Sequence, residues 1–111
     1  MKKILLVDDD SDFLQILSSA LEKDFEVYKA DGISQALKII DTVPIDAICS
    51  DFYMRDGTGL DLLKKIHSEN ITFPFLLMSG SDDAKLMDVV LNYDAQFCCK
   101  TDKLINKIKE L

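Results

Sequence analysis

Short apolar runs alternate along this chain with longer segments in which apolar residues recur every three or four positions. The short runs are rich in β-branched residues and are typical of strands buried on both faces of a sheet. They lie at residues 4–7, 26–30, 45–49, 74–78 and 96–99. The segment after each run has the periodicity of an amphipathic helix. The pattern therefore predicts five strand-then-helix units.

Each helical segment is expected to bury one face. These faces consist of Phe13, Ile16, Leu17, Ala20 and Leu21; Ile33, Ala36, Leu37 and Ile40; Leu60, Leu63 and Ile66; Leu86, Val89 and Val90; and Leu104, Ile105, Ile108 and Leu111. Asp10 or Ser11 is expected to cap the first helix, and Thr101 or Asp102 the fifth, because their side-chain oxygens can accept from free backbone N–H groups. The fourth helix is expected to follow the acidic start Asp82-Asp83.

Five such units predict one α/β domain over residues 1–111, with a doubly wound five-stranded parallel sheet. Right-handed crossovers leave few topologies for it. A dinucleotide-binding fold is a rival interpretation. However, no G-x-G-x-x-G follows the first strand, and acidic residues stand where the phosphate-binding glycines would be.

Composition narrows the choice of partners. The chain has a formal net charge of -7 with 30% charged residues, which disfavours nucleic acid and anionic membrane surfaces and suits cations or basic partners. No apolar run approaches the roughly 20 residues of a membrane span, and the first run breaks at Asp8, too early for a signal peptide. A cytoplasmic location is expected. Cys49, Cys98 and Cys99 are read as reduced, buried apolar residues.

Candidate chemistry gathers where the predicted strands end. The first, third, fourth and fifth strands run into Asp8-Asp9-Asp10, Ser50-Asp51, Ser79-Gly80-Ser81 and Lys100-Thr101. Ligands of open α/β sheets bind at this carboxyl edge. Taken singly, such aspartates and serines fit helix caps, and such a lysine fits a solvated surface. All four strand ends taken together favour a site.

The residue types at this edge suit phosphoryl transfer. If the first and third strands are neighbours, Asp8, Asp9 and Asp51 lie close together. Like charges at that separation either raise one another's pKa or require a cation, and oxygen ligands favour Mg2+. A carboxylate can also act as a nucleophile that accepts a phosphoryl group. Lys100 and the Ser79 hydroxyl could then bind its oxygens.

Four motifs in order resemble the receiver domain of two-component response regulators, over essentially the whole chain. They are "LLVDDD" (Leu5–Asp10), "SDFYMRDGTGLDLL" (Ser50–Leu63), "LLMSGSDD" (Leu76–Asp83) and "FCCK" (Phe97–Lys100). The resemblance implies a flavodoxin-like (βα)5 fold with strand order 2-1-3-4-5.

The resemblance also implies a role for each matching residue. Asp51 would be the phosphoacceptor. Asp9 would bind Mg2+ directly, Asp8 largely through water, and the Tyr53 backbone carbonyl would complete the protein's metal ligands. Lys100 would be the catalytic lysine that binds the phosphoryl group. Ser79 and Phe97 would be the switch residues, the first through its hydroxyl and the second through its aromatic ring.

The function so implied is a phosphorelay signalling switch rather than an enzyme, although the domain would assist its own phosphorylation and dephosphorylation. A histidine kinase or phosphotransfer protein would supply the phosphoryl group, and a downstream protein would read the result. A second copy of the chain is a further candidate partner. No nucleic acid or membrane contact is expected through this domain.

Two departures from the family pattern keep an alternative open. Arg55 and Thr101 stand where the family usually has prolines, after Met54 and Lys100. The sequence leaves open whether the bond before Thr101 is cis or trans. The alternative function is a phosphorylation-independent, receiver-like interaction module. An aspartyl phosphohydrolase fits less well, because position 53, where such enzymes need a second aspartate, is tyrosine.

Overall fold

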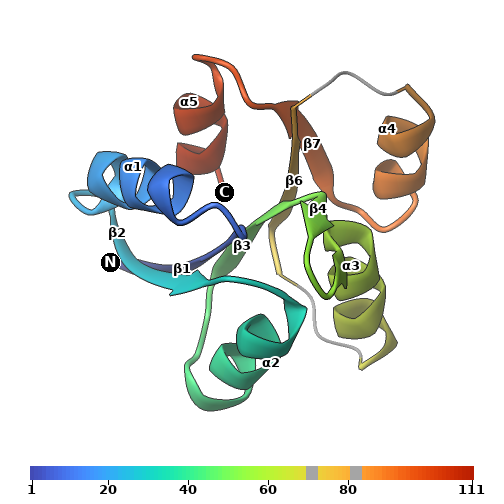
Figure 1. Cartoon of the computed structure of the whole chain (residues 1–111), viewed down its shortest axis with the longest axis horizontal. Coiled ribbons are helices and arrows are strands. Elements are labelled where there is room, and N and C mark those ends of the chain that lie inside the picture. Colours follow the sequence, from blue (N-terminus) through green and yellow to red (C-terminus); the bar gives the residue numbers. More distant parts are fainter. Residues whose placement is uncertain (70–72, 81–83) are drawn as a thin grey trace.

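The computed structural model describes residues 1–69, 73–80 and 84–111. Its main sheet is parallel, with strands in the order β2-β1-β3-β6-β7 (Figure 1). These strands are β1 (Lys2–Val7), β2 (Phe25–Ala30), β3 (Ala47–Asp51), β6 (Phe75–Ser79) and β7 (Gln96–Cys99). Counted over these five strands, the order is 2-1-3-4-5, so the predicted topology is confirmed.

Helices cover both faces of the sheet (Figure 1). They are α1 (Ser11–Leu21), α2 (Ile33–Thr42), α3 (Gly59–Ser68), α4 (Ala84–Leu91) and α5 (Leu104–Lys109). The helices α1 and α5 pack on one face, and α2, α3 and α4 on the other. The doubly wound α/β architecture is therefore as predicted. Within the described ranges, no helix has the length and apolar character needed to cross a membrane.

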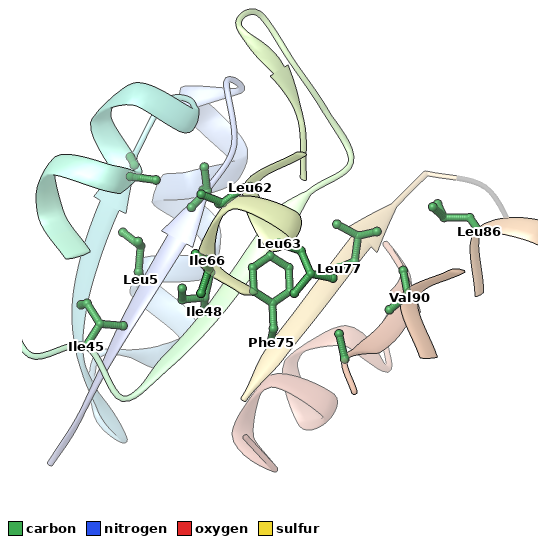
Figure 2. Close-up of a cluster of buried hydrophobic side chains, with 14 residues drawn as sticks. Leu5, Ile45, Ile48, Leu62, Leu63, Ile66, Phe75, Leu77, Leu86 and Val90 are labelled. Carbon is green, nitrogen blue, oxygen red and sulfur yellow. The ribbon is translucent and has the colours of Figure 1, made fainter. Parts of the chain in front are cut away.

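The sheet divides the core into two clusters. Successive strand residues point to opposite faces, so Leu5 and Val7 join the cluster under α2, α3 and α4, while Ile4 and Leu6 join the cluster under α1 and α5. Figure 2 shows the first cluster, in which Phe75 lies among leucines and isoleucines from the strands and from α3. Fully burying one such side chain stabilises the fold by about 1.5–3 kcal/mol.

The buried face of α1 differs from the prediction. Leu14, Leu17 and Leu21 are its buried residues, whereas Ile16 is 64% exposed and Ala20 is also exposed. At 3.6 residues per turn, Ile16 lies almost opposite Leu14 around the helix. Ile16 and Leu14 each belong to an apolar pattern of helical spacing. The prediction took the pattern that contains Ile16 as the buried one, and the structure buries the pattern that contains Leu14.

The ends of two other segments also differ from expectation. Neither expected residue caps α5: the residue before the helix is Lys103, which makes no side-chain cap, and the Thr101 hydroxyl accepts from the backbone N–H of Lys103 at 3.3 Å. The loop after β3 forms a small antiparallel hairpin of β4 (Tyr53–Met54) and β5 (Gly57–Thr58). The expected acidic start of α4, Asp82-Asp83, lies outside the described residues.

Candidate functional site

The carboxyl edge of the sheet brings the predicted site residues to four neighbouring strands. Asp51 is the last residue of β3 and Ser79 the last of β6, while Asp8 follows β1 and Lys100 follows β7. Backbone hydrogen bonds continue beyond the strands here, from the N–H of Asp8 to Ala30 O at 3.1 Å and from the N–H of Lys100 to Ser79 O at 2.8 Å. The side chains therefore project from backbone that is held by the sheet.

Lys100 joins two of these carboxylates directly. Its Nζ lies 3.0 Å from Asp8 Oδ2 and 3.1 Å from Asp51 Oδ1. The Asp8 side chain is 1% exposed, that of Asp51 13% and that of Lys100 23%. A carboxylate as buried as Asp8 requires a paired charge and hydrogen bonds, and the ammonium supplies both. The fold thus places an acidic pair and an amine together, 43 to 92 residues apart in sequence.

The surroundings of the site raise the pKa of both Lys100 and Asp51. Burial, reinforced by the negative charge of Asp8, raises the pKa of Asp51 above its ordinary value, although Lys100 acts in the opposite direction. Burial alone would lower the pKa of Lys100, but its hydrogen bonds to Asp8 and Asp51 outweigh burial and raise that pKa. Lys100 is therefore an ammonium at neutral pH.

The same edge contains a group of oxygen donors that suits a hard cation. Carboxylate oxygens of Asp8, Asp9 and Asp51 all lie within 4.8 Å of one another. Few protein oxygens with room for water and phosphate describe the way Mg2+ is bound in phosphoryl-transfer sites. Lys100 offsets only one negative charge of this group. The remaining negative charge fits a divalent cation.

The start of α1 holds the acidic stretch in order. The backbone N–H of Asp10 donates to Asp8 Oδ1 at 3.0 Å, and Asp10 Oδ1 accepts from the N–H groups of Asp12 and Phe13, both at 3.1 Å. Asp10 is therefore the N-cap, one of the two predicted, and its charge is favourable at a helix N-terminus. Asp10 therefore fixes the start of α1 and lies outside the group of carboxylates that could hold a cation.

Phe13 is a neighbour of the site that the sequence did not reveal. Its ring centroid lies 4.4 Å from Lys100 Nζ, which places the ammonium over the aromatic face. The sequence suggested only a core role for Phe13. No local pattern could have indicated a contact with a lysine at the far end of the chain.

The remaining predicted residues lie at or near this edge. Ser79 is 6% exposed at the end of β6. Phe97 is half-buried in β7, opposite Leu77, and packs against the cluster under α2, α3 and α4. Tyr53 begins β4 with a side chain that is 72% exposed. The proposed metal role of the Tyr53 carbonyl and the switch roles of Ser79 and Phe97 stay predictions.

The loop after Asp51 is held against α2 by a contact that the sequence did not predict. Asp56 accepts from the backbone N–H groups of Ile33 at 2.9 Å and Ser34 at 3.0 Å. These hydrogen bonds lower the pKa of Asp56. Gly32 precedes α2, and a Cβ placed there would lie 2.6 Å from Asp56 Oδ1. A glycine therefore leaves space for a cap that arrives from another part of the chain.

The departure at Thr101 leaves Lys100 in place. None of the peptide bonds in the described part of the chain is cis, so the Lys100–Thr101 bond is trans. The sequence had left both forms open. Lys100 still reaches both carboxylates in this arrangement.

Comparisons with known proteins relate most of this chain to one domain family. The model of the response regulator receiver domain family matches residues 4–109. The chain is 37% identical over 81 residues to the nisin biosynthesis regulatory protein NisR of Lactococcus lactis, covering 72% of this chain and 35% of NisR. It is 34% identical over 96 residues to the transcriptional regulatory protein CpxR of Escherichia coli K12, covering 85% of this chain and 41% of CpxR. The chain thus spans well under half the length of these relatives.

Solved structures show the same fold. The receiver domain of the Francisella response regulator 1452 superposes with a TM-score of 0.90 at 26% identity, over 99% of this chain and 95% of that one. The non-phosphorylated HemR receiver domain of Leptospira biflexa gives a TM-score of 0.86 at 28% identity, over 97% and 89% of the two chains.

Proposed function

The chain belongs to the response regulator receiver domain family, and from this premise we propose that it accepts a phosphoryl group on Asp51 with Mg2+ bound. The observation that carries the proposal is the junction of Lys100 with Asp8 and Asp51, at 3.0 and 3.1 Å. A phosphoacceptor needs a nucleophilic oxygen, a cation on the transferring group and a fixed positive side chain. Asp51, the Asp8–Asp9 pair and Lys100 correspond to these three parts.

The proposed donor is a phosphohistidine on a histidine kinase or phosphotransfer protein. An Asp51 carboxylate oxygen attacks phosphorus, an O–P bond forms, and the P–N bond to the histidine breaks. The leaving nitrogen keeps the electron pair of that bond and takes up a proton. Lys100 exchanges contacts with carboxylates for contacts with phosphoryl oxygens, and the Ser79 hydroxyl donates to another oxygen.

Mg2+, when bound by Asp8, Asp9, Asp51 and the Tyr53 carbonyl, offsets negative charge on the phosphoryl oxygens. The protein's own contribution is to hold these oxygens at one sheet edge. Asp8 is fixed there by the N–H of Asp10, and Asp51 by the pairing of β3 with β6. A preorganised set of ligands reduces the reorganisation needed at the moment of transfer.

The proposed consequence is a population shift. A phosphoryl group stabilises whichever conformation lets Ser79 and Lys100 contact it, and only that difference in contacts can move the equilibrium. Phe97 packs beside the core under α4, so its repacking would carry the change to the surface of β6, α4 and β7. Leu91 and Met87 are exposed on α4, at 66% and 39%, and are available there to a downstream protein. We place this signalling in the cytoplasm.

A phosphorylation experiment tests the proposal. The protein is incubated with Mg2+ and acetyl phosphate, and its intact mass is measured. We expect the mass of one added phosphoryl group, absent from Asp51→Asn and from samples with excess EDTA. Asp31→Asn is the matched control, because Asp31 is an exposed aspartate that follows β2 at the same sheet edge. It should be phosphorylated like the wild type.

The same experiment separates the alternative. Wild-type protein that gains no phosphoryl group would refute the proposal and favour the phosphorylation-independent interaction module. A phosphoryl group that survives Asp51→Asn would show a different acceptor.

Metal binding is tested without phosphorylation. A ligand that binds only the folded state stabilises it by about 2.7 kcal/mol at one hundred times its Kd. We expect Mg2+ to raise the urea midpoint of the wild type, with a smaller shift for Asp9→Asn and an unchanged one for Asp31→Asn. Equal shifts in all three proteins would place the bound cation elsewhere.

A further inference from the structure

The geometry points to Phe13 as a positioning residue for Lys100: its ring holds the ammonium over the site through a cation–π contact. The inference rests on the proposed function for its catalytic consequence. Its structural part can be tested independently. The central observation is that the ring centroid lies 4.4 Å from Lys100 Nζ, well inside the distance of about 6 Å at which such contacts are attractive.

The ring completes the surroundings of the ammonium. Lys100 carries three N–H donors and contacts Asp8 and Asp51 through its head group. An aromatic face attracts the positive charge through its quadrupole and offers no competing carboxylate. Phe13 can therefore hold the amine in place while the N–H donors of Lys100 remain directed at carboxylates or at a phosphoryl group.

Phe13 is itself held firmly enough to act in this way. Its backbone N–H donates to the capping carboxylate of Asp10 at 3.1 Å, which fixes the first turn of α1. Its half-buried side chain packs against the cluster under α1 and α5, as do those of Cys98 and Ile105. Asp10 thus organises two groups, because its carboxylate accepts from Phe13 and its backbone N–H donates to Asp8.

This placement gives the first turn of α1 a second purpose. Asp8 contacts Lys100 from the strand end, and Phe13 contacts it from the helix five residues later. A side chain as flexible as lysine loses considerable rotamer freedom when it is held in one place. We infer that sharing this restraint between a carboxylate and a ring lets Lys100 leave the carboxylate during transfer without leaving the site.

The first test measures the position of Lys100 in solution. Protons held over an aromatic face are shifted upfield in NMR spectra. We expect the Lys100 ε-methylene protons to be shifted upfield in the wild type and in Phe13→Tyr, and to return to ordinary values in Phe13→Leu. Phe25→Leu makes the same change elsewhere in the same cluster and should leave them shifted. Ordinary values in the wild type would overturn the inference, whatever the protein does with phosphoryl groups.

The second test grades the strength of the contact. Phe13 is replaced by phenylalanines with one, two or three ring fluorines, which weaken the attraction for a cation with little change in ring size. We expect the acetyl phosphate phosphorylation rate to fall with each fluorine. In Phe13→Leu the expected decrease is about 2- to 30-fold, the range of cation–π contacts between exposed and desolvated sites. Phe13→Tyr should retain most of the rate.

A double-mutant cycle links the effect to Lys100. In a Lys100→Met background, Phe13→Leu should change the residual rate very little, because no cation remains for the ring to hold. An equal loss in both backgrounds, or a rate that is indifferent to fluorination, would show that Phe13 is only a packing residue. Failure of wild-type phosphorylation would refute the proposed function instead, and the NMR measurement would still decide where Lys100 lies.

Discussion

The helices α1 and α2 begin at the same edge of the sheet, and the N-terminus of each is capped by one aspartate. The two aspartates lie at very different distances along the sequence from the helices that they cap. Asp10 immediately precedes α1 and accepts from the N–H groups of Asp12 and Phe13. Asp56 lies 23 residues beyond the start of α2 and accepts from Ile33 and Ser34. The chemistry of the two caps is the same. Only the route of the chain differs.

The difference has a functional side. The cap of α1 belongs to the stretch that supplies the candidate metal ligands, so forming the helix also arranges the acids. The cap of α2 belongs to the loop that leaves Asp51 and contains Tyr53. Asp56 therefore anchors the loop after Asp51 to a neighbouring helix, and its loss should affect a larger part of the structure than the loss of a local cap.

Asp56→Ala should accordingly have the largest effect on stability. It removes both hydrogen bonds that Asp56 accepts at the N-terminus of α2 and frees the β4–β5 hairpin. We expect the free energy of unfolding to fall by about 2 kcal/mol, the upper end for N-caps, measured by urea denaturation. Asp31→Ala, which removes an exposed aspartate just before α2, should cost much less. Equal losses in the two variants would show that Asp56 does not hold the loop.

Gly32→Ala should come next, because its cost depends on Asp56. The added Cβ would lie 2.6 Å from Asp56 Oδ1, so the carboxylate must move and give up its hydrogen bonds. We expect a loss of about 1.5 kcal/mol in the wild type. In an Asp56→Ala background the same substitution should cost little, since neighbouring substitutions that remove one interaction are not additive. Additive losses would mean that the alanine clashes with something other than the cap.

The two helix starts also show how far sequence can be used to predict this molecule. The Asp10 cap was predicted as one of two adjacent candidates because its signal is local. The strand order followed from the resemblance to the receiver family, whereas the meeting of Asp8, Asp51 and Lys100 was predictable because the carboxyl ends of parallel strands share one edge. The Asp56 cap was not, since Asp56-Gly57 resembles an ordinary turn and nothing near it indicates α2.

Two further misses have the same cause. The exposure of Ile16 depends on which side of α1 meets the sheet, and two patterns of helical spacing overlap in that segment. The contact of Phe13 with Lys100 joins residues that only the completed fold brings together. Periodicity and the residues at the strand ends were therefore sufficient for the order of the elements and for the edge that carries the site. They were insufficient for the start of α5 and for contacts made across the fold.

Asp10→Ala is expected to have a smaller effect than either change at α2. The helix loses two hydrogen bonds and a favourable charge at its N-terminus, at a cost of about 1 kcal/mol. Asp10→Ser should recover most of that stability, because a hydroxyl also caps. Urea midpoints of the three proteins check this. If serine fails to restore stability, the main contribution of Asp10 is its negative charge at the N-terminus of α1 rather than its hydrogen bonds.

The smallest effect we predict is a pH dependence of the Asp56 cap of α2. Hydrogen bonds from Ser34 and Ile33 lower the folded-state pKa of Asp56, so the stability it contributes is present above its unfolded pKa and is lost as pH falls through its folded pKa. Asp56→Asn removes this titration and keeps one amide oxygen as acceptor. The wild type should therefore exceed Asp56→Asn in free energy of unfolding at neutral pH, and the difference should shrink below about pH 4. Urea denaturation of both proteins across this range measures it, and subtraction cancels the titration of the other carboxylates. A difference that stays constant down to the lowest pH would show that geometry, and not the charge of the distant aspartate, holds the start of α2.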